Sequence, residues 1–150
     1  MEITKLPNKV LSKKLAKVDV EDIKNGKISS LVLTMKKAMK DNQGVGLAAN
    51  QIGKNLAIFV IDETLAKESE VTDVYFNPEI TEYSKDVDEM EEGCLSIPEF
   101  FAEIKRSKKI KIKFINENGN KQKIKARSFL ARVLQHEMDH LNGLTIKNKK

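Results

Sequence analysis

The segment Ser128-Phe-Leu-Ala-Arg-Val-Leu-Gln-His-Glu-Met-Asp-His-Leu-Asn142 decides what the rest of the fold must be built around. Its apolar residues recur at helical spacing, and Gly143 follows as a typical helix stop. The chain's two histidines, His136 and His140, stand four residues apart, so both imidazoles lie on one helix face and can bind one metal ion. Glu137, beside the first histidine, can act as a general base on a metal-bound water. The sequence therefore predicts a metal-binding helix near the C-terminal end.

A third protein ligand is needed for an open catalytic metal site, and it must come from upstream of this helix. Residues 141–150 contain neither histidine nor glutamate. The single cysteine, Cys94, stands in Glu92-Gly-Cys-Leu-Ser96. A lone cysteine is more often a small buried hydrophobic residue. Beside two imidazoles, however, a thiolate completes a ligand set that suits iron(II) or zinc, so we interpret Cys94 as the third ligand.

The composition describes one globular domain. The 150 residues are 40% hydrophobic, with 3 Pro, 7 Gly and no repeat or low-complexity tract, so we expect a single catalytic domain over residues 1–150. The longest apolar stretches, 45–49 and 56–61, are far shorter than the roughly 20 residues that span a membrane. The N-terminus shows no secretory signal, and one cysteine cannot form an internal disulfide, so we expect a reducing compartment.

Hydrophobic periodicity predicts several further elements. Their order, a helix, several strands and a late helix, predicts an α+β fold with a mainly antiparallel sheet. The expected elements are a helix near 28–40, a buried strand at 56–61, a strand at 74–76 stopped by Asn77-Pro78, a strand at 110–115, a hairpin turn at 116–120 and a more exposed strand at 121–126.

Charge is segregated along the chain, whose formal net charge is +5. Residues 86–92 are mostly acidic and residues 105–109 mostly basic. We interpret both runs as solvated loops or strand faces, with a weak contact between the basic surface and RNA as the alternative. Aromatic residues make up only 5%, and no RNA-binding module is present, so dedicated nucleic-acid binding is not expected.

Small residues dominate the segment Gly44-Val-Gly-Leu-Ala-Ala-Asn-Gln51. It lacks the spacing and the lysine of a phosphate-binding loop. Two interpretations stay open: a tight helix-to-strand connection, or a strand that lines a substrate site with Gln51 as a hydrogen-bond donor.

Taken together and in this order, three segments resemble the peptide deformylase family. Residues 44–51 resemble its first motif, 92–96 its second and 135–140 its third. The opening at 6–11, the Asn77-Pro78 dipeptide and the turn at Asn118-Gly119 are similar as well, so the resemblance covers nearly the whole chain. It implies antiparallel sheets packed around a central metal-binding helix, with an N-terminal helix.

Family members remove the formyl group from the N-terminal formyl-methionine of newly synthesised polypeptides and release formate. The resemblance implies that Cys94, His136 and His140 bind the metal. Glu137 would be the general base and then the proton donor to the leaving amine. Gln51 and the backbone N–H of Leu95 would stabilise the charge on the formyl oxygen.

The resemblance also implies a substrate site. The methionine side chain would enter an apolar pocket made by Val45, Met90, Leu95, Val133 and the ring of His136. Backbone atoms of Val45, Gly46 and Gly93 would hold the peptide like an added strand.

The implied cofactor is one divalent transition metal per chain. Iron(II) is expected in the cell, with zinc, nickel or cobalt able to substitute. The expected partner is a nascent formyl-methionyl peptide, with no membrane association, and the enzyme is expected to be a monomer. Its expected location is the bacterial cytoplasm, or the host cytoplasm if a phage encodes it.

Two departures from the family pattern stand out. Where many members carry an arginine, this chain has Glu99-Phe-Phe-Ala102, whose two Phe could form an apolar wall; Arg106 matches a later family arginine and is expected to pair with Glu92. The chain also ends a short segment after the metal helix, whereas many bacterial members continue into a helix implicated in ribosome docking. In this it is similar to the short forms of some phages and reduced bacteria.

Three other functions are disfavoured by particular residues. A zinc endopeptidase of the common types would carry its third ligand downstream of His140. An inactive relative would not need both Gln51 and Glu137. A basic binding module has no use for Cys94 together with two histidines.

Overall fold

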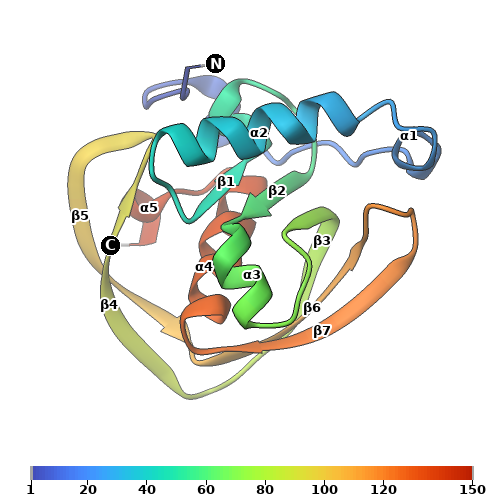
Figure 1. The fold of residues 1–150 in the computed structure, drawn as a ribbon. Coiled ribbons are helices and arrows are strands. Elements are labelled where there is room, and N and C mark those ends of the chain that lie inside the picture. The colour runs from blue at the N-terminus through green and yellow to red at the C-terminus, as the bar shows by residue number, and fades with distance from the viewer. Residues whose placement is uncertain (1, 150) are drawn as a thin grey trace.

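The computed structural model describes residues 2–149 and shows an α+β fold, as predicted. A five-stranded antiparallel sheet has the order β1-β2-β3-β6-β7, and β4 and β5 form a separate hairpin (Figure 1). The strands are β1 (Gly46–Ala48), β2 (Ile58–Ile61), β3 (Val74–Tyr83), β4 (Val87–Cys94), β5 (Ile97–Ser107), β6 (Lys109–Ile115) and β7 (Lys121–Arg127). The helices are η1 (Lys9–Ser12), α1 (Val20–Lys24), α2 (Ser29–Asp41), η2 (Ala49–Ile52), α3 (Glu63–Glu68), α4 (Ser128–Leu141) and α5 (Ile146–Lys149).

Strand β2 lies between two layers of helix, which explains its uninterrupted apolar sequence. Phe59 and Ile61 belong to the core that α4 covers, whereas Ile58 and Val60 belong to the core that α2 covers. All four side chains are fully buried. Because successive residues of a strand point to opposite faces, a strand covered on both faces needs apolar residues at every position.

Helix α4 matches the predicted segment closely and runs through the centre of the molecule (Figure 1). Leu130 and Leu134 pack against the sheet in the same core as Phe59. The helix ends before Gly143, which has a φ of 77°. A Cβ on Gly143 would also lie 2.7 Å from the backbone carbon of Ser12, so both the turn and the close packing require glycine here.

The predicted hairpin at residues 110–126 is confirmed as β6 and β7. Its inward side chains alternate with lysines, and Ile112 pairs with Ile124 across the strands. The turn is held by the side chain of Asn116, which accepts hydrogen bonds from the backbone N–H groups of Asn118 and Asn120. The short polar turn therefore sets the register that keeps Ile110, Ile112 and Ile124 on the face toward the α4 core.

The expectation that Pro78 ends its strand is wrong, because β3 continues to Tyr83. The register shifts between Phe76 and Glu79, and Asn77 adopts a φ of 48°. The Asn77 side chain exchanges two hydrogen bonds with the backbone of Val18, at 2.7 and 2.9 Å. The irregularity accommodates a proline, which has no N–H for the ladder, without ending the strand.

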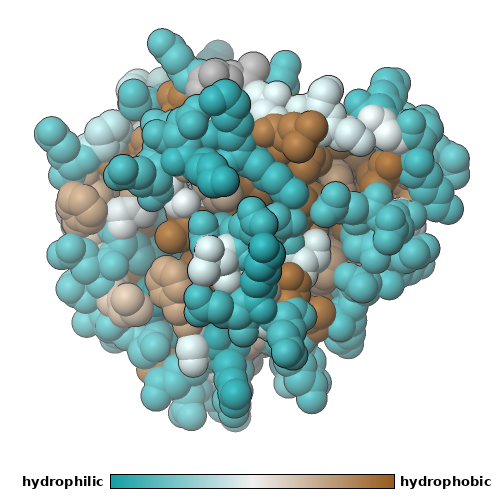
Figure 2. Space-filling model, in the orientation of Figure 1, coloured by the Kyte–Doolittle hydropathy of each residue, from teal (hydrophilic) through white to brown (hydrophobic). Residues whose placement is uncertain are grey.

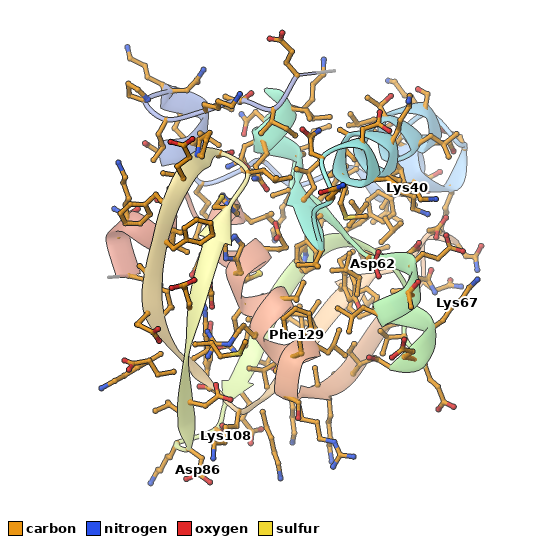
Figure 3. The ribbon with its side chains drawn as sticks, turned by 60° about the vertical axis from the view of Figure 1, so that its left-hand side comes forward. Lys40, Asp62, Lys67, Asp86, Lys108 and Phe129 are labelled. Carbon is orange, nitrogen blue, oxygen red and sulfur yellow. The ribbon has the colours of Figure 1, made fainter. Side chains whose placement is uncertain are left out.

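Both charged runs lie mostly on strand faces rather than in loops, and the contact of the basic surface with RNA stays a prediction. The acidic run lies on β4 and pairs with β5, so that Asp88 stands opposite Arg106. Asp86 and Lys108 mark the far end of this hairpin (Figure 3), where the Lys108 N–H donates to the Asp86 carbonyl at 2.9 Å. A small core of Ile97, Ile104 and Ile146 packs beneath it.

The face of the molecule seen in Figure 2 is mostly hydrophilic, with hydrophobic residues in small separate areas. Within residues 2–149, no helix combines the length and the apolar character that crossing a membrane requires.

Candidate metal centre and active site

The two histidines of α4 meet the cysteine at the end of β4. The ligand atoms of Cys94, His136 and His140 all lie within 4.8 Å of one another. The sulfur of Cys94 is 3.3 Å from Nε2 of His140, which is completely buried. Sulfur and nitrogen atoms bound tetrahedrally to one zinc-like ion lie about 3.6 Å apart, because the bonds are about 2.3 and 2.1 Å. The spacing therefore suits a shared ion.

Glu137 lies beside this cluster and is 3% exposed. Its Oε1 has no hydrogen-bond partner among the residues that the structure describes. Burial raises the pKa of this carboxyl to about 7, against the lowering effect of His136 and Arg106. A carboxyl with a pKa near neutrality can both take and return a proton at physiological pH.

Gly46 leaves the space that the Glu137 carboxyl occupies. A Cβ at position 46 would lie 2.6 Å from Oε2 of Glu137. The small residues of the 44–51 segment form the tight helix-to-strand connection between α2 and β1, and they let the backbone come close to the carboxyl. The other interpretation, a strand that lines a substrate site, stays a prediction.

His136 is oriented by Glu92, whose Oε1 lies 2.9 Å from Nδ1 of the ring. Arg106 binds both oxygens of Glu92, at 3.0 and 2.9 Å, which confirms the predicted ion pair. Burial by itself raises the pKa of Glu92, but the hydrogen bonds from His136 and Arg106 outweigh it and hold that pKa well below its usual range. A carboxylate on the far ring nitrogen leaves Nε2 of His136 free to face the cluster.

Sequence analysis missed two residues of this network. Arg132, one turn before His136, is 4% exposed. It donates to Glu92, to the carbonyl of Ile104 at 3.0 Å and to the carboxylate of Asp88 at 2.8 Å. Asp139 accepts from Arg106. The four-residue spacing from Arg132 to His136 was a visible signal, because it places the arginine on the metal-facing side of the helix.

The surroundings shift the pKa values of His136 and His140 in opposite directions. Burial lowers the pKa of His136, but hydrogen bonds with Cys94 and Glu92 and the charge of Glu137 outweigh it and raise the pKa to about 10. For His140, burial and then the nearby His136 hold the pKa well below its usual value. His140 is therefore neutral at Nε2, as a metal ligand must be, and a cation bound to His136 would take the place of a proton.

Gln51 reaches the same centre from η2. Its Oε1 accepts from the Ala48 N–H at 3.0 Å, which orients the amide so that Nε2 points toward β4. Nε2 donates to the hydroxyl of Ser96 at 3.2 Å and lies 3.7 Å from the sulfur of Cys94. Leu95 lies between these two residues in the β4–β5 turn.

A cavity of about 600 Å³ opens onto this centre. It brings together every residue assigned to the substrate site from the sequence: Val45, Gly46, Met90, Gly93, Leu95, Val133 and His136. Gln51, Cys94 and Glu137 line it as well, whereas His140 lies buried behind them.

Two aromatic side chains stand at the cavity's mouth. Phe101 is 62% exposed, and its ring lies so close to Gly93 that a Cβ there would be 2.7 Å away. Phe129, on the first turn of α4, lies near the β4–β5 hairpin (Figure 3). Phe101 belongs to the expected apolar wall. Phe100 lies instead under the amine of Lys147, 5.3 Å from its ring centroid.

The donor set fits a divalent transition metal. One thiolate and two imidazoles suit iron(II) or zinc, and three protein ligands leave a coordination position for water. Oε1 of Glu137, which has no hydrogen-bond partner among residues 2–149, is an acceptor available to a water in this cavity. A centre of this composition beside a buried carboxyl is typical of a metal-dependent hydrolase.

The chain belongs to the polypeptide deformylase family, whose model matches residues 1–149. A peptide deformylase of Prochlorococcus marinus is 44% identical over 147 residues, which are 96% of this chain and 70% of that protein. The solved peptide deformylase of Thermotoga maritima superimposes with a TM-score of 0.87 at 36% identity, over 99% of this chain and 95% of that one.

A class I type b peptide deformylase from Acinetobacter baumannii, solved with Met-Ala-Ser bound, has a TM-score of 0.90 at 26% identity, over 100% of this chain and 98% of that one. The family is metal-dependent, and its known activity is removal of the formyl group from N-terminal formyl-methionine. This chain is an enzyme of that family.

Proposed function

We propose that this chain deformylates nascent formyl-methionyl peptides with a metal ion held by Cys94, His136 and His140. The observation that carries the proposal is the convergence of these three side chains at the base of one open cavity, which Cys94, His136 and Glu137 line. When bound there, the metal would lower the pKa of its water and polarise the formyl carbonyl.

Glu137 takes a proton from the attacking water and delivers it to the nitrogen of the breaking amide bond. The pKa of about 7 suits both steps. Water thus supplies one of the two oxygens of formate, the other being the formyl oxygen, and the peptide leaves with a free amino group. Nε2 of Gln51 and the N–H of Leu95 donate hydrogen bonds to the formyl oxygen as its negative charge develops.

The methionine side chain enters the cavity between Val45, Met90, Leu95 and Val133, against the ring of His136. The backbone of Val45, Gly46 and Gly93 holds the peptide in an extended conformation, as an edge strand holds an added strand. The Met-Ala-Ser complex of the Acinetobacter baumannii enzyme supports a methionine-first peptide as the ligand.

Iron(II) is the proposed metal in the cell, with zinc, nickel or cobalt able to replace it. Metal analysis of protein purified without oxygen tests this assignment. Iron should be the major metal, and iron-loaded enzyme should lose activity in air faster than nickel-loaded enzyme, through oxidation of iron and of Cys94. A different major metal would contradict the iron assignment. Equal decay of both forms with unmodified Cys94 would contradict the metal-centred account of the loss in air.

The activity is tested by formate release from formyl-Met-Ala-Ser under anaerobic conditions. Cys94→Ala should lose both metal and activity. Ser12→Ala, which changes an exposed residue outside the cavity, is the control and should keep both. Full turnover by Cys94→Ala would contradict the proposed metal centre.

The proposal extends to where the enzyme works. We place it in the cytoplasm of a bacterium, or of the host if a phage encodes it, as a monomer in weak contact with RNA through basic surface residues. The free Cys94 supports a reducing compartment. Sedimentation at increasing protein concentration tests the monomeric state.

A further inference from the structure

The β6–β7 hairpin carries more than the whole net charge of the chain. Residues 109–127 contain seven basic residues and one acidic residue, a formal charge of +6, against +5 for all 150 residues. The basic residues occupy alternate positions on each strand, so they share one face, which we call the basic face. On β6 they are Lys109, Lys111 and Lys113. On β7 they are Lys121, Lys123, Lys125 and Arg127.

Like charges stand directly opposite one another on this face. Lys109 pairs in register with Arg127, Lys111 with Lys125, and Lys113 with Lys123. Like charges at directly opposed positions destabilise a sheet. Such an arrangement therefore works against the stability of the hairpin rather than for it.

Few of these charges are neutralised within the chain. Lys111 contacts Glu82 at 3.1 Å, and Lys113 contacts Glu79 at 3.5 Å, both on the neighbouring strand β3. Within residues 2–149, the other five cations of the basic face have no carboxylate partner. The face is thus left with uncompensated positive charge.

Protection of the sheet edge explains only part of the pattern. β7 is the outer strand of its sheet, and lysines on an edge strand prevent pairing with other chains. β6, however, is covered by β3 on one side and β7 on the other, so its lysines protect no edge.

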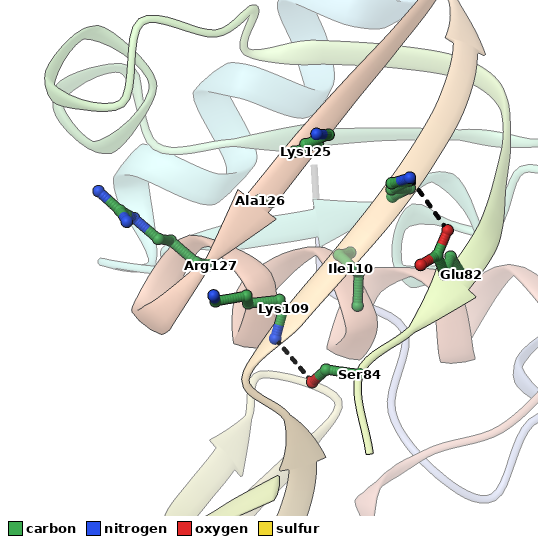
Figure 4. A pocket seen from close by; sticks show the side chains of 8 residues that line it. Glu82, Ser84, Lys109, Ile110, Lys125, Ala126 and Arg127 are labelled. Atoms are coloured by element: carbon green, nitrogen blue, oxygen red, sulfur yellow. Dashed lines mark hydrogen bonds and ion pairs between the residues drawn. The ribbon is translucent and has the colours of Figure 1, made fainter. Parts of the chain in front are cut away.

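The face is hollowed as well as charged. A groove of about 490 Å³ runs between Glu82 and Ser84 on one side and Lys125 and Arg127 on the other, with Lys109 projecting beside it (Figure 4). None of the eight residues that line it is aromatic, so it offers no ring for stacking bases. The groove can bind a chain of phosphates but cannot read bases.

The basic face lies away from the catalytic cavity. The β4–β5 hairpin borders the cavity, and the β6–β7 hairpin lies on the other side of α4 (Figure 1). No residue lines both the groove and the cavity. A partner on the basic face would leave the mouth of the cavity open.

We propose that the basic face of the β6–β7 hairpin is a docking surface for the phosphate backbone of folded RNA. The inference gives the RNA contact proposed above a location and does not depend on catalysis. Helical RNA suits the face better than a single strand, because double-stranded RNA is recognised mainly through its phosphates and sugars. A concave groove also fits a ridge of phosphates better than it fits a flat membrane surface.

The test compares two triple variants with the same loss of charge. One is Lys109→Gln/Lys125→Gln/Arg127→Gln on the basic face. The control is Lys13→Gln/Lys17→Gln/Lys54→Gln, which removes three exposed lysines from another part of the surface. Binding to a fluorescein-labelled RNA hairpin is measured by anisotropy over a series of salt concentrations.

The unchanged protein and the control should bind alike. The basic-face variant should bind more weakly. Its slope of log affinity against log salt should fall by about one for each cation that no longer reaches a phosphate, about three in all. Equal weakening of both variants would show an effect of net charge alone and overturn the proposal. The proposal would also be overturned if the unchanged protein bound phosphatidylserine vesicles but not RNA, and the basic-face variant lost that vesicle binding.

Deformylation and folding provide independent readouts. The basic-face variant should keep its formate release from formyl-Met-Ala-Ser, and its thermal midpoint should not fall. Loss of RNA binding with activity intact supports the docking surface. An unchanged protein that releases no formate but binds the RNA hairpin would contradict only the catalytic proposal.

Discussion

The two long hairpins use charge in opposite ways. On β4–β5, Glu92 is buried and held by Arg106 and Arg132, so acidic and basic groups neutralise each other inside the protein. On β6–β7, lysine faces lysine in solvent, and only two of the seven cations of the basic face have a carboxylate partner among residues 2–149. The first arrangement fixes the position of a histidine, whereas the second leaves charge available for a partner. The following predictions test this contrast from the largest expected effect to the smallest.

The largest effect is expected at Glu137, next to the cluster that β4 completes. Glu137→Gln preserves the shape of the side chain but cannot take a proton from water, so turnover should fall about 10²-fold or more. Formate release and metal content are measured on the same sample. Near-normal turnover with metal bound would remove Glu137 from the mechanism.

Arg132→Met should cost about 3 kcal/mol of unfolding free energy, because it leaves the buried Glu92 with one arginine instead of two. The matched control is Arg127→Met on the basic face, which has no carboxylate partner in the described structure and should change stability by less than about 0.5 kcal/mol. Urea unfolding measures both. Equal losses of unfolding free energy in the two variants would show that the two hairpins do not differ in how they use charge.

Gln51→Leu should lower kcat by about 10²–10³-fold with a smaller effect on KM. A donor to the developing negative charge acts mainly in the transition state. Steady-state kinetics with formyl-Met-Ala-Ser separate the two constants. A raised KM with unchanged kcat would make Gln51 a binding residue only.

Gly46→Ala should lower turnover by up to about 10²-fold, because the new methyl group would displace the Glu137 carboxyl. The double variant Gly46→Ala/Glu137→Gln should be no slower than Glu137→Gln alone, because the alanine acts through Glu137. A further loss in the double variant would point to disruption of the peptide-binding backbone instead.

The smallest effect is expected on the basic face. Lys125→Gln removes the cation opposite Lys111 and should raise stability at low salt by less than about 0.5 kcal/mol. High salt should abolish the gain, because it screens exposed charges. Lys54→Gln, whose lysine is exposed and without an ion-pair partner in the described structure, is the control and should show no gain. If Lys125→Gln lowered stability instead, the packing of the Lys125 side chain would outweigh its repulsion of Lys111.

Local patterns predicted those parts of the fold in which neighbours in sequence are neighbours in space. The helix around His136 and the hairpin that turns at Asn116 each form from one continuous segment, so periodicity and turn residues predicted them. The strand through Pro78 was missed because its continuation depends on the side chain of Asn77 binding the backbone of Val18, 59 residues earlier.

The same distinction between local and long-range contacts applies to the residues of the candidate site. The amino-acid sequence alone determined that His136, Glu137 and His140 share a helix, because an α-helix brings residues four apart onto one face. The need for a third ligand predicted Cys94, and the resemblance implied the role of Gln51. Only the tertiary structure brings Cys94 to His140, across 46 residues of separation, and Gln51 to Cys94, across 43. Arg132 and Asp139 as partners of the Glu92–Arg106 pair were likewise decided by the packing of β4 and β5 against α4. A contact between distant segments depends on how the whole chain packs, and no local pattern in the sequence encodes it.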